Sequence, residues 1–185
     1  MRPARARSAS RCPNATARAG NVIGGGDWAD HRLIPDCVRA YLSSSAVILR
    51  YPQAVRPWQH VFESISGYIQ LAEHLSGENG SQFASAWNFG PDKEDIWSVV
   101  EVASKACQLL NVPIQIKTQS HNQPEATLLM LDSSKANEYL NWKPQWPLQK
   151  TIDETIAWYH AWWEGKHMLQ FSKEQIQRYQ EVANG

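Results

Sequence analysis

Short strand-like runs alternate with longer stretches of helical periodicity along most of this 185-residue chain. Apolar residues spaced i, i+3, i+4 and i+7 predict amphipathic helices, whereas brief runs rich in β-branched and aromatic residues predict strands. The predicted helices cover residues 33–44, 63–76, 96–110, 133–140, 151–163 and 172–182, and the predicted strands cover 15–23, 46–51, 55–62, 85–90 and 112–117. The alternation predicts an α/β or α+β fold. The strands are too few and too scattered for a complete doubly wound sheet.

One face of the helix predicted over 63–76 is apolar. Ile65, Tyr68, Ile69, Ala72 and Leu75 share that face, and we expect it to point into the core.

Two helix starts can be predicted from capping residues. Asp92 is the expected N-cap of the helix over 96–110. Ser172 with Gln175 forms a capping-box pattern, which predicts the start of the last helix.

Three consecutive glycines in NVIGGGDW, residues 21–28, suggest a phosphate-binding loop at first sight. A dinucleotide-binding turn needs the spacing G-x-G-x-x-G, because separate glycines serve the turn, the pyrophosphate and the helix packing. A Walker loop needs G-x-x-x-x-G-K-[ST]. The run fits neither pattern. It predicts instead a loop whose backbone takes a positive φ or passes close to another group.

Three arginines in the first third of the chain are candidates for binding an anion. Arg32 comes just before the predicted helix that begins at Leu33, and the free N–H groups of a helix start favour negative charge. Arg50 and Arg56 lie on neighbouring extended pieces, and two guanidinium groups suit a diphosphate. The aromatic side chains interleaved with them, which can stack on a base, are Tyr51, Trp58 and His60.

A structural role remains open for the same arginines. Acidic residues such as Asp36 or Glu63 can pair with them as ordinary surface ion pairs.

Other sites have weaker support in the sequence. His160 and His167 can share a helix face, although a solvated pair is the ordinary interpretation of two such histidines. The late tryptophans can stack on a sugar or pack in the core; they are Trp142, Trp146, Trp158, Trp162 and Trp163. No HExxH, GxSxG or zinc-type Cys/His spacing occurs, so no metal site is predicted.

The composition limits the partners and the compartment. Lys plus Arg equals Asp plus Glu at 18 each, so no long-range field favours nucleic acid or an anionic membrane. The three cysteines form no CxxC and fit a reducing compartment, for which the cytoplasm is the default. No run approaches the roughly 18 apolar residues of a membrane span. Residues 1–14 are rich in arginine and contain no acid, so we expect a disordered or artefactual leader, with a transit peptide as the alternative.

Four segments of the chain resemble a known family. They are ATARAGNVIGGGDWADHRLIPD, VRPWQHVFESISGYIQLAE, SAWNFGP and PEATLLMLDSSKANEYLNWKPQW. Together they resemble the C-terminal half of the nucleotide-sugar 4,6-dehydratases in the extended short-chain dehydrogenase/reductase superfamily, and GGGDW with RPWQHV favours the branch that acts on CDP-glucose. The resemblance covers residues 15–165 and leaves 166–185 as a C-terminal helical tail. It implies the last strands and helices of a Rossmann-type fold with the small α+β substrate-binding domain.

The resemblance also implies roles for individual residues, all of them in binding. Asn21 is expected to touch the sugar diphosphate, Arg32 and Leu33 to begin the helix that faces it, and Arg56 to grip the diphosphate. Arg50 is expected beside the cytosine nucleotide.

Two further pairs of residues are assigned by the same resemblance. His121 and Glu125 are expected in a segment that closes over the nucleotide. Ala19 and Gly20 are expected near the nicotinamide of NAD.

The implied function is that of an NAD-dependent hydro-lyase in deoxysugar biosynthesis, which converts CDP-glucose to CDP-4-keto-6-deoxyglucose and water. The family's glycine-rich NAD turn and catalytic Tyr-x-x-x-Lys pair are expected to lie outside this chain, so we expect sugar-nucleotide binding without turnover. The alternatives are a non-catalytic binding module, an inactive gene remnant, or a subunit that complements a separate N-terminal half. Because an incomplete sheet leaves an edge and apolar faces uncovered, a homodimer or larger oligomer is also expected.

Overall fold

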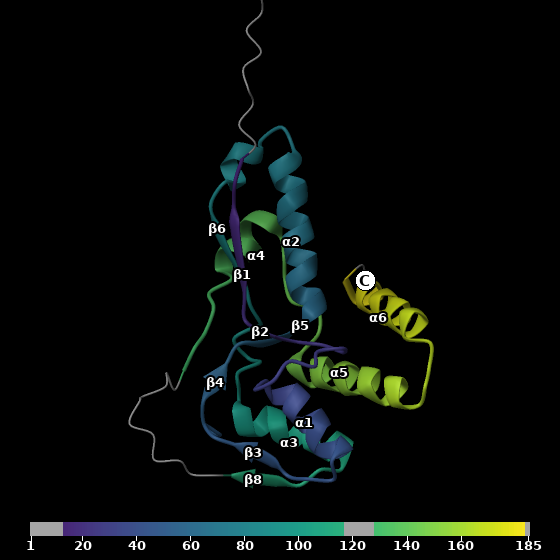
Figure 1. Ribbon diagram of the computed structural model, residues 1–185. Helices are drawn as coiled ribbons and strands as arrows, with labels where there is room; N and C mark the ends of the chain where they lie inside the picture. The colour runs from purple at the N-terminus through teal and green to yellow at the C-terminus, as the bar shows by residue number, and fades with distance from the viewer. Residues whose placement is uncertain (1–12, 117–127, 184–185) are drawn as a thin grey trace, which may run out of the picture.

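The computed structural model describes residues 13–116 and 128–183, and it combines short strands with longer helices in an α/β arrangement (Figure 1). The strands are β1 (Thr16–Ala19), β2 (Asn21–Ile23), β3 (Val47–Leu49), β4 (Val55–Arg56), β5 (Trp58–His60), β6 (Ala86–Phe89), β7 (Trp97–Ser98) and β8 (Ile114–Ile116). The helices are α1 (Leu33–Leu42), α2 (Val61–Ser76), the 3₁₀ turn η1 (Gly80–Phe83), α3 (Val99–Leu110), α4 (Ser134–Leu140), α5 (Leu148–Trp163) and α6 (Met168–Ala183).

The strands pair only in twos within the described residues. β1 pairs with β6, β2 with β5 and β3 with β8, all in parallel, while β4 and β7 are antiparallel. Parallel strands usually lie in larger sheets that helices cover on both faces. The prediction of an α/β fold with an incomplete sheet is therefore confirmed.

The larger of two hydrophobic cores fills the lower part of the molecule in Figure 1, which we call the lower region. Helices α1, α3 and α5 surround it, and strands β2, β3 and β5 contribute to it. Its largest fully buried side chains include Tyr159, Ile34, Leu110, Ile152 and Ile156. The predicted helical spacing of α1, α3 and α5 is confirmed, since their apolar stripes meet here.

The smaller core lies in the part of the molecule drawn uppermost, which we call the upper region and which comprises β1, β6, α2, η1 and α4. Trp87 and Phe89 of β6 are at its centre. Gly67 of α2 lies directly against Phe89, where a Cβ would come within 2.3 Å of the ring. The absence of a side chain at this position thus lets α2 pack closely on β6.

The predicted inward face of α2 is wrong for four of its five residues, since of these five only Leu75 packs against the smaller core. Ile65, Tyr68 and Ile69 are 46%, 38% and 55% exposed. The helix instead turns Gly67 and Leu71, together with two polar residues, toward the protein. Periodicity locates an apolar stripe but does not say what covers it. The single strand predicted over 15–23 is two strands, β1 and β2, and three of the four residues of β1 are exposed.

Two predicted helix starts are also corrected. Ser98, not Asp92, caps α3: its hydroxyl accepts from the Glu101 amide, and the Glu101 carboxylate accepts from the Ser98 amide. Helix α6 begins at Met168, so Ser172 lies inside it, where its hydroxyl accepts a hydrogen bond from Trp158 Nε1 at 3.0 Å.

A buried carboxylate joins the two regions. Glu63, at the start of α2, accepts hydrogen bonds from the main-chain amides of Gln145 and Trp146 at 3.0 and 2.9 Å. It also accepts one from the Tyr179 hydroxyl of α6 at 2.7 Å. Burial raises the pKa of Glu63. The three hydrogen-bond donors oppose this rise but do not cancel it. This carboxylate thus ties α2 to the segment before α5 and to the C-terminal helix.

His60 is the N-cap residue of α2, close to the contacts that Glu63 makes. It is 1% exposed, and its Nδ1 accepts from the Phe62 amide at 3.3 Å. Burial lowers the pKa of His60 to about 4, because the charged imidazolium would lose its hydration. The ring is therefore neutral at pH 7.

Candidate functional site

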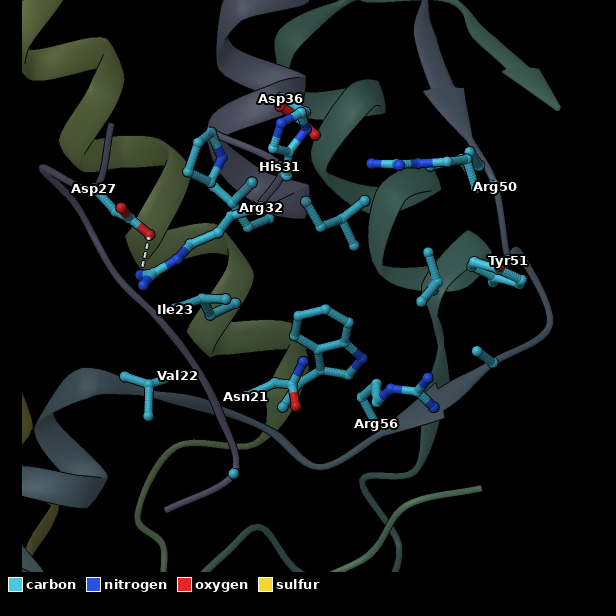
Figure 2. Close-up of a pocket in the computed structure, with 18 of the residues that line it drawn as sticks. Asn21, Val22, Ile23, Asp27, His31, Arg32, Asp36, Arg50, Tyr51 and Arg56 are labelled. Carbon is cyan, nitrogen blue, oxygen red and sulfur yellow. Dashed lines mark hydrogen bonds and ion pairs between the residues drawn. The ribbon is translucent and has the colours of Figure 1, made fainter. Parts of the chain in front are cut away.

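A cavity of about 560 Å³ lies in the lower region, between the strand-to-helix loop after β2 and the segment that follows β3. Figure 2 shows Asn21, Arg32, Arg50, Tyr51 and Arg56 arranged around this space. These residues come from four separate stretches of backbone: the first residue of β2, the residue before α1, the two residues after β3 and the end of β4. The fold thus gathers in one place most of the polar residues that the sequence singled out.

Gly24 of the glycine run lines the cavity, and the two glycines after it pack against Trp158 of α5. A Cβ at Gly25 would come within 2.0 Å of Trp158 Cγ, so only glycine fits against that indole. Gly26 has a φ of +80°, a conformation that side chains disfavour. The prediction that the glycine run forms a loop in close contact with another group is confirmed, and that group is the side chain of Trp158.

A second aromatic residue of α5 holds the end of this loop. The hydroxyl of Tyr159 donates to the main-chain carbonyl of Asp27 at 2.6 Å. Burial, with the nearby charge of Asp27, raises the pKa of Tyr159 to about 12, so the phenol stays protonated and remains a donor. Two neighbouring residues of α5 therefore fix the backbone from Gly25 to Asp27.

The start of α1 faces the cavity. Arg32 is its N-cap residue, and no side chain caps the helix there. Leu33 and Ile34, which follow it, both line the cavity. Uncapped N–H groups and the positive end of the helix dipole favour an anion at this end. The Arg32 guanidinium also donates to the Asp27 carboxylate at 3.0 Å, as the dashed line in Figure 2 shows.

Arg50 and Arg56 line the opposite side of the cavity. Arg50 follows β3, and Arg56 belongs to β4, where its Nη1 donates to the Val55 carbonyl at 2.8 Å. In Figure 2 the Arg50 side chain extends from its strand toward the start of α1, whereas the Arg56 guanidinium lies over its own strand. Tyr51 and Trp58 also line it, so cationic and aromatic groups lie around one cavity.

The structural alternative holds for Arg32, which forms an ion pair with Asp27, whereas the two acids considered have other partners. Asp36 pairs with Arg39 on the same helix. Glu63 is buried against main-chain amides and Tyr179.

The residues predicted to bind ligands fall into three groups. The members that line the cavity are Gly20, Asn21, Arg32, Leu33, Arg50 and Arg56. Ala19 does not line it and is paired with Phe89 at the end of β1. His121 and Glu125 lie outside the described residues.

Sequence reasoning missed two residues of the site. One is Asp27, which lines the cavity and pairs with Arg32. Its position in GGGDW, five residues before an arginine, is a sequence signal that could have identified it. His31 also lines the cavity and has a φ of +62°, which the sequence does not reveal.

A Tyr-x-x-x-Lys spacing, expected to be absent, does occur at Tyr139 and Lys143. The expectation is therefore wrong as a statement about the sequence. Helix α4 ends at Leu140, and Asn141 takes a left-handed conformation between the two residues. An i, i+4 pair shares a face only within a continuous helix. Neither residue lines the cavity, and Tyr139 is 61% exposed.

The remaining candidates, which are the late tryptophans and the two C-terminal histidines, do not line the cavity. Trp142 and Trp146 are buried in the protein, whereas Trp162 is 42% exposed. His160 lies within 3.3 Å of the Leu109 carbonyl, and His167 accepts from the Gln170 amide, so the two histidines do not converge.

Residues 13–116 and 128–183 contain no cluster of three or more His, Cys, Asp or Glu side chains that could hold a metal ion. Nor do they contain a helix of the length and apolarity needed to cross a membrane.

Comparisons with known proteins show which proteins the chain is similar to. No protein-family model matches the chain. CDP-glucose 4,6-dehydratase of Salmonella typhimurium is 46% identical over 166 residues, which are 89% of this chain and 46% of that protein. The chain thus spans about half the length of the curated relative that it matches.

Solved structures agree on the fold. A dTDP-glucose 4,6-dehydratase from Bacillus anthracis in complex with NAD has a TM-score of 0.62 at 19% identity, over 79% of this chain and 44% of that one. A UDP-glucose-4-epimerase from Stenotrophomonas maltophila with bound NAD has a TM-score of 0.67 at 20% identity, over 82% and 48%. The chain is therefore similar in sequence to part of CDP-glucose 4,6-dehydratase, consistent with a C-terminal part of that enzyme, and it shares the Rossmann-type fold of these epimerases and dehydratases over less than half of their length.

Proposed function

We propose that the cavity binds a sugar nucleotide such as CDP-glucose. The observation that supports this most directly is the set of three arginines, Arg32, Arg50 and Arg56, around one cavity with the uncapped start of α1. Guanidinium groups and a helix N-terminus are the groups that proteins use for a diphosphate. Asn21 adds an amide that can hydrogen-bond to a sugar hydroxyl.

The orientation of the ligand follows from where the charges and rings lie. The diphosphate is assigned to Arg56, Arg32 and the α1 start. The base is assigned to the side of Arg50 and Tyr51, where an aromatic ring and a guanidinium plane offer stacking surfaces. The sugar then lies near Asn21.

NAD belongs to the chemistry of the related enzymes, whose structures contain it. The described residues of this chain do not fit an NAD site by themselves. Gly20 lies against Pro57, with a Cβ position 2.1 Å from its carbonyl oxygen, and Gly25 lies against Trp158. A pyrophosphate has to come close to the backbone at glycine, but protein atoms already occupy the space beside these two glycines. The assignment of Ala19 and Gly20 to the nicotinamide stays a proposal for an assembly that includes the remaining half of the fold.

The proposed role of the chain alone is therefore recognition without turnover. Dehydration at C5 and C6 after oxidation at C4 requires a hydride acceptor and a base at the sugar. An assay with CDP-glucose and added NAD should give no 4-keto-6-deoxy sugar from this chain alone. Product formation would contradict the proposal.

Binding can be tested by isothermal titration with CDP and CDP-glucose. Arg56→Gln should weaken binding on the order of tenfold, since it removes a charge-assisted hydrogen bond to the diphosphate of about 1.5 kcal/mol or more. Arg50→Gln should weaken binding by a smaller factor, since it removes the guanidinium plane that stacks on the base. Arg18→Gln is the matched control, because Arg18 is exposed on β1 and does not line the cavity. A folded protein that gives no heat with either ligand would exclude the proposal. A broad unfolding transition without binding would favour an inactive gene remnant.

A further inference from the structure

Two buried cysteines meet between helices α1 and α3, in the core of the lower region. Cys37 of α1 is 0% exposed and Cys107 of α3 is 2% exposed, and both are free thiols. Their Sγ atoms lie 3.7 Å apart, within reach of an S–H···S hydrogen bond. The two residues are 70 positions apart in the sequence, so no CxxC spacing signals the pair. The fold therefore creates a dithiol that the sequence does not reveal.

Small side chains allow the two helices to come close at this point. Ala40 lies one turn after Cys37 on α1, and Ala103 lies one turn before Cys107 on α3. Both alanines are buried in the same core as the cysteines. The S–S length of a disulfide is about 2.05 Å, so the two sulfurs stand short of bonding distance. Bond formation has to turn the two side chains or draw α1 and α3 together.

The two thiols differ in how readily they ionise. The hydrogen bond between them and burial raise the pKa of Cys37, whereas the same hydrogen bond lowers the pKa of Cys107. The thiolate is the form of cysteine that reacts with an oxidant. Cys107 is therefore the sulfur that reacts first, and Cys37 is the sulfur that closes the bond.

Both helices reach the candidate cavity with their N-terminal ends. Pro35 and Asp36 of α1 line it, and so does Val99 of α3. The Asp36 amide donates to the Arg32 carbonyl at 2.9 Å, at the start of α1, and Cys37 is the next residue. A movement of Cys37 toward α3 therefore acts on the turn of α1 that lines the cavity.

We propose that Cys37 and Cys107 are an oxidation site, at which a reversible disulfide forms between α1 and α3 and alters the α1 end of the cavity. The oxidant is a peroxide. The Cys107 thiolate attacks one oxygen of hydrogen peroxide, the O–O bond breaks, and a sulfenic acid and hydroxide form.

The second step closes the bond. The Cys37 sulfur attacks the Cys107 sulfur, the S–O bond breaks, and the oxygen leaves as hydroxide. The two sulfurs lose two electrons together, and with the two thiol protons the peroxide becomes two molecules of water. A dithiol reductant reverses the bond by thiol–disulfide exchange.

The first test follows the bond itself in the full chain with Cys12→Ser, which leaves only these two cysteines. After treatment with hydrogen peroxide, the protein is unfolded in denaturant and alkylated with N-ethylmaleimide. Intact-mass spectrometry should show both thiols alkylated in the untreated protein, neither in the treated protein, and both again after dithiothreitol. Full alkylation after peroxide would show that the pair serves only as small apolar side chains and would overturn the proposal. A loss of alkylation that dithiothreitol does not restore would also overturn it.

The second test follows the effect on the cavity in the same Cys12→Ser protein. Amides of residues 36–39 should exchange with solvent about threefold faster or more after peroxide treatment, whereas amides of α4 should keep their rates. Adding Cys37→Ala gives the matched control, because peroxide can still oxidise methionine there but cannot form the bond. If that variant does not fold, reversal by dithiothreitol supplies the control. Unchanged exchange at 36–39 in the disulfide form would overturn the proposal.

The expected effect on ligand binding rests on the proposed function. The disulfide form should bind CDP about threefold more weakly than the reduced form, since the helix end that favours the diphosphate is displaced. A reduced chain that binds no CDP would contradict the proposed function alone, because the mass and exchange readouts do not involve the ligand. A chain that binds CDP equally well in both forms would overturn the proposed link between the bond and the cavity.

Discussion

The lower and upper regions of the molecule differ in how completely each is enclosed. The lower core contains 17 buried apolar residues, and helices α1, α3 and α5 surround it. The upper core contains six, and beside it lie the β1 edge and the exposed face of α2. The cavity belongs to the lower region. The cavity proposed to bind the ligand thus lies where the chain packs most completely on itself.

The largest expected effect comes from breaking the small core. Phe89 is fully buried at its centre, so Phe89→Ala should cost about 4 kcal/mol of local unfolding free energy. Native-state hydrogen exchange should show this loss in α2 and β6, while amides of α3 keep most of their protection. Leu169→Ala, at a 62% exposed site on α6, is the control and should change little. An equal loss in α3 would mean that the two regions unfold as one unit.

The joint between the regions should be nearly as sensitive. Glu63→Gln replaces an oxygen that accepts two hydrogen bonds, from the Gln145 amide and the Tyr179 hydroxyl, with an amide group that donates. The free energy of unfolding should fall by about 3 kcal/mol in chemical denaturation. Glu73→Gln, on the exposed side of the same helix, should stay within about 0.5 kcal/mol. A loss below about 1 kcal/mol for Glu63→Gln would show that the joint tolerates the amide.

Acidification should weaken the same joint in a defined window. The pKa of His60 is about 4 in the folded protein and 6.5 as the reference, so the unfolded state binds more protons between these values. Stability from this group is therefore lost as pH falls below 6.5, by about 2 kcal/mol at pH 5.

The pH effect can be assigned by comparing variants. His60→Asn keeps a side-chain acceptor at the α2 start and should remove this part of the pH dependence. Glu63 works in the opposite direction, because its raised pKa favours folding as pH falls through that raised value toward 4.5. The difference between wild type and variant isolates His60. Parallel pH profiles of the two proteins would contradict the assignment.

The smallest expected effect concerns the link between the lower core and the ligand loop. Tyr159→Phe removes the donor to the Asp27 carbonyl and should cost about 1 kcal/mol. Amides of the loop at 24–27 should exchange faster, and CDP should bind more weakly. Tyr139→Phe, at an exposed site, is the control. An unchanged loop would show that Trp158 packing alone holds it.

The sequence predicted helices better than it predicted what they touch. The spacing in α1, α3 and α5 located stripes that meet in the lower core. The same rule failed for α2, because its stripe of Ile65, Tyr68 and Ile69 is exposed and Gly67 does the packing. Periodicity measures the pattern of one element, whereas burial depends on a second element that the pattern does not identify.

Only some features of the candidate site could be predicted from the sequence. Asn21, Arg32, Arg50 and Arg56 could be assigned by resemblance and by guanidinium chemistry, and the fold brings them to one cavity. The hydrogen bond from Tyr159 to Asp27 spans 132 residues, and no local signal predicts a contact across that separation. The positive φ of His31 is equally invisible to composition, because it results from the loop path around it.

The contact between Gly25 and Trp158 has a consequence for how this loop can vary. A methyl group at position 25 would overlap the indole, which Ser172 also holds by a hydrogen bond. Positions 25 and 158 are therefore coupled by volume, and a relative with alanine in the middle of the glycine run should have a smaller side chain on the facing helix. The glycine run would then serve as a marker in sequence comparisons for a tryptophan more than a hundred residues away.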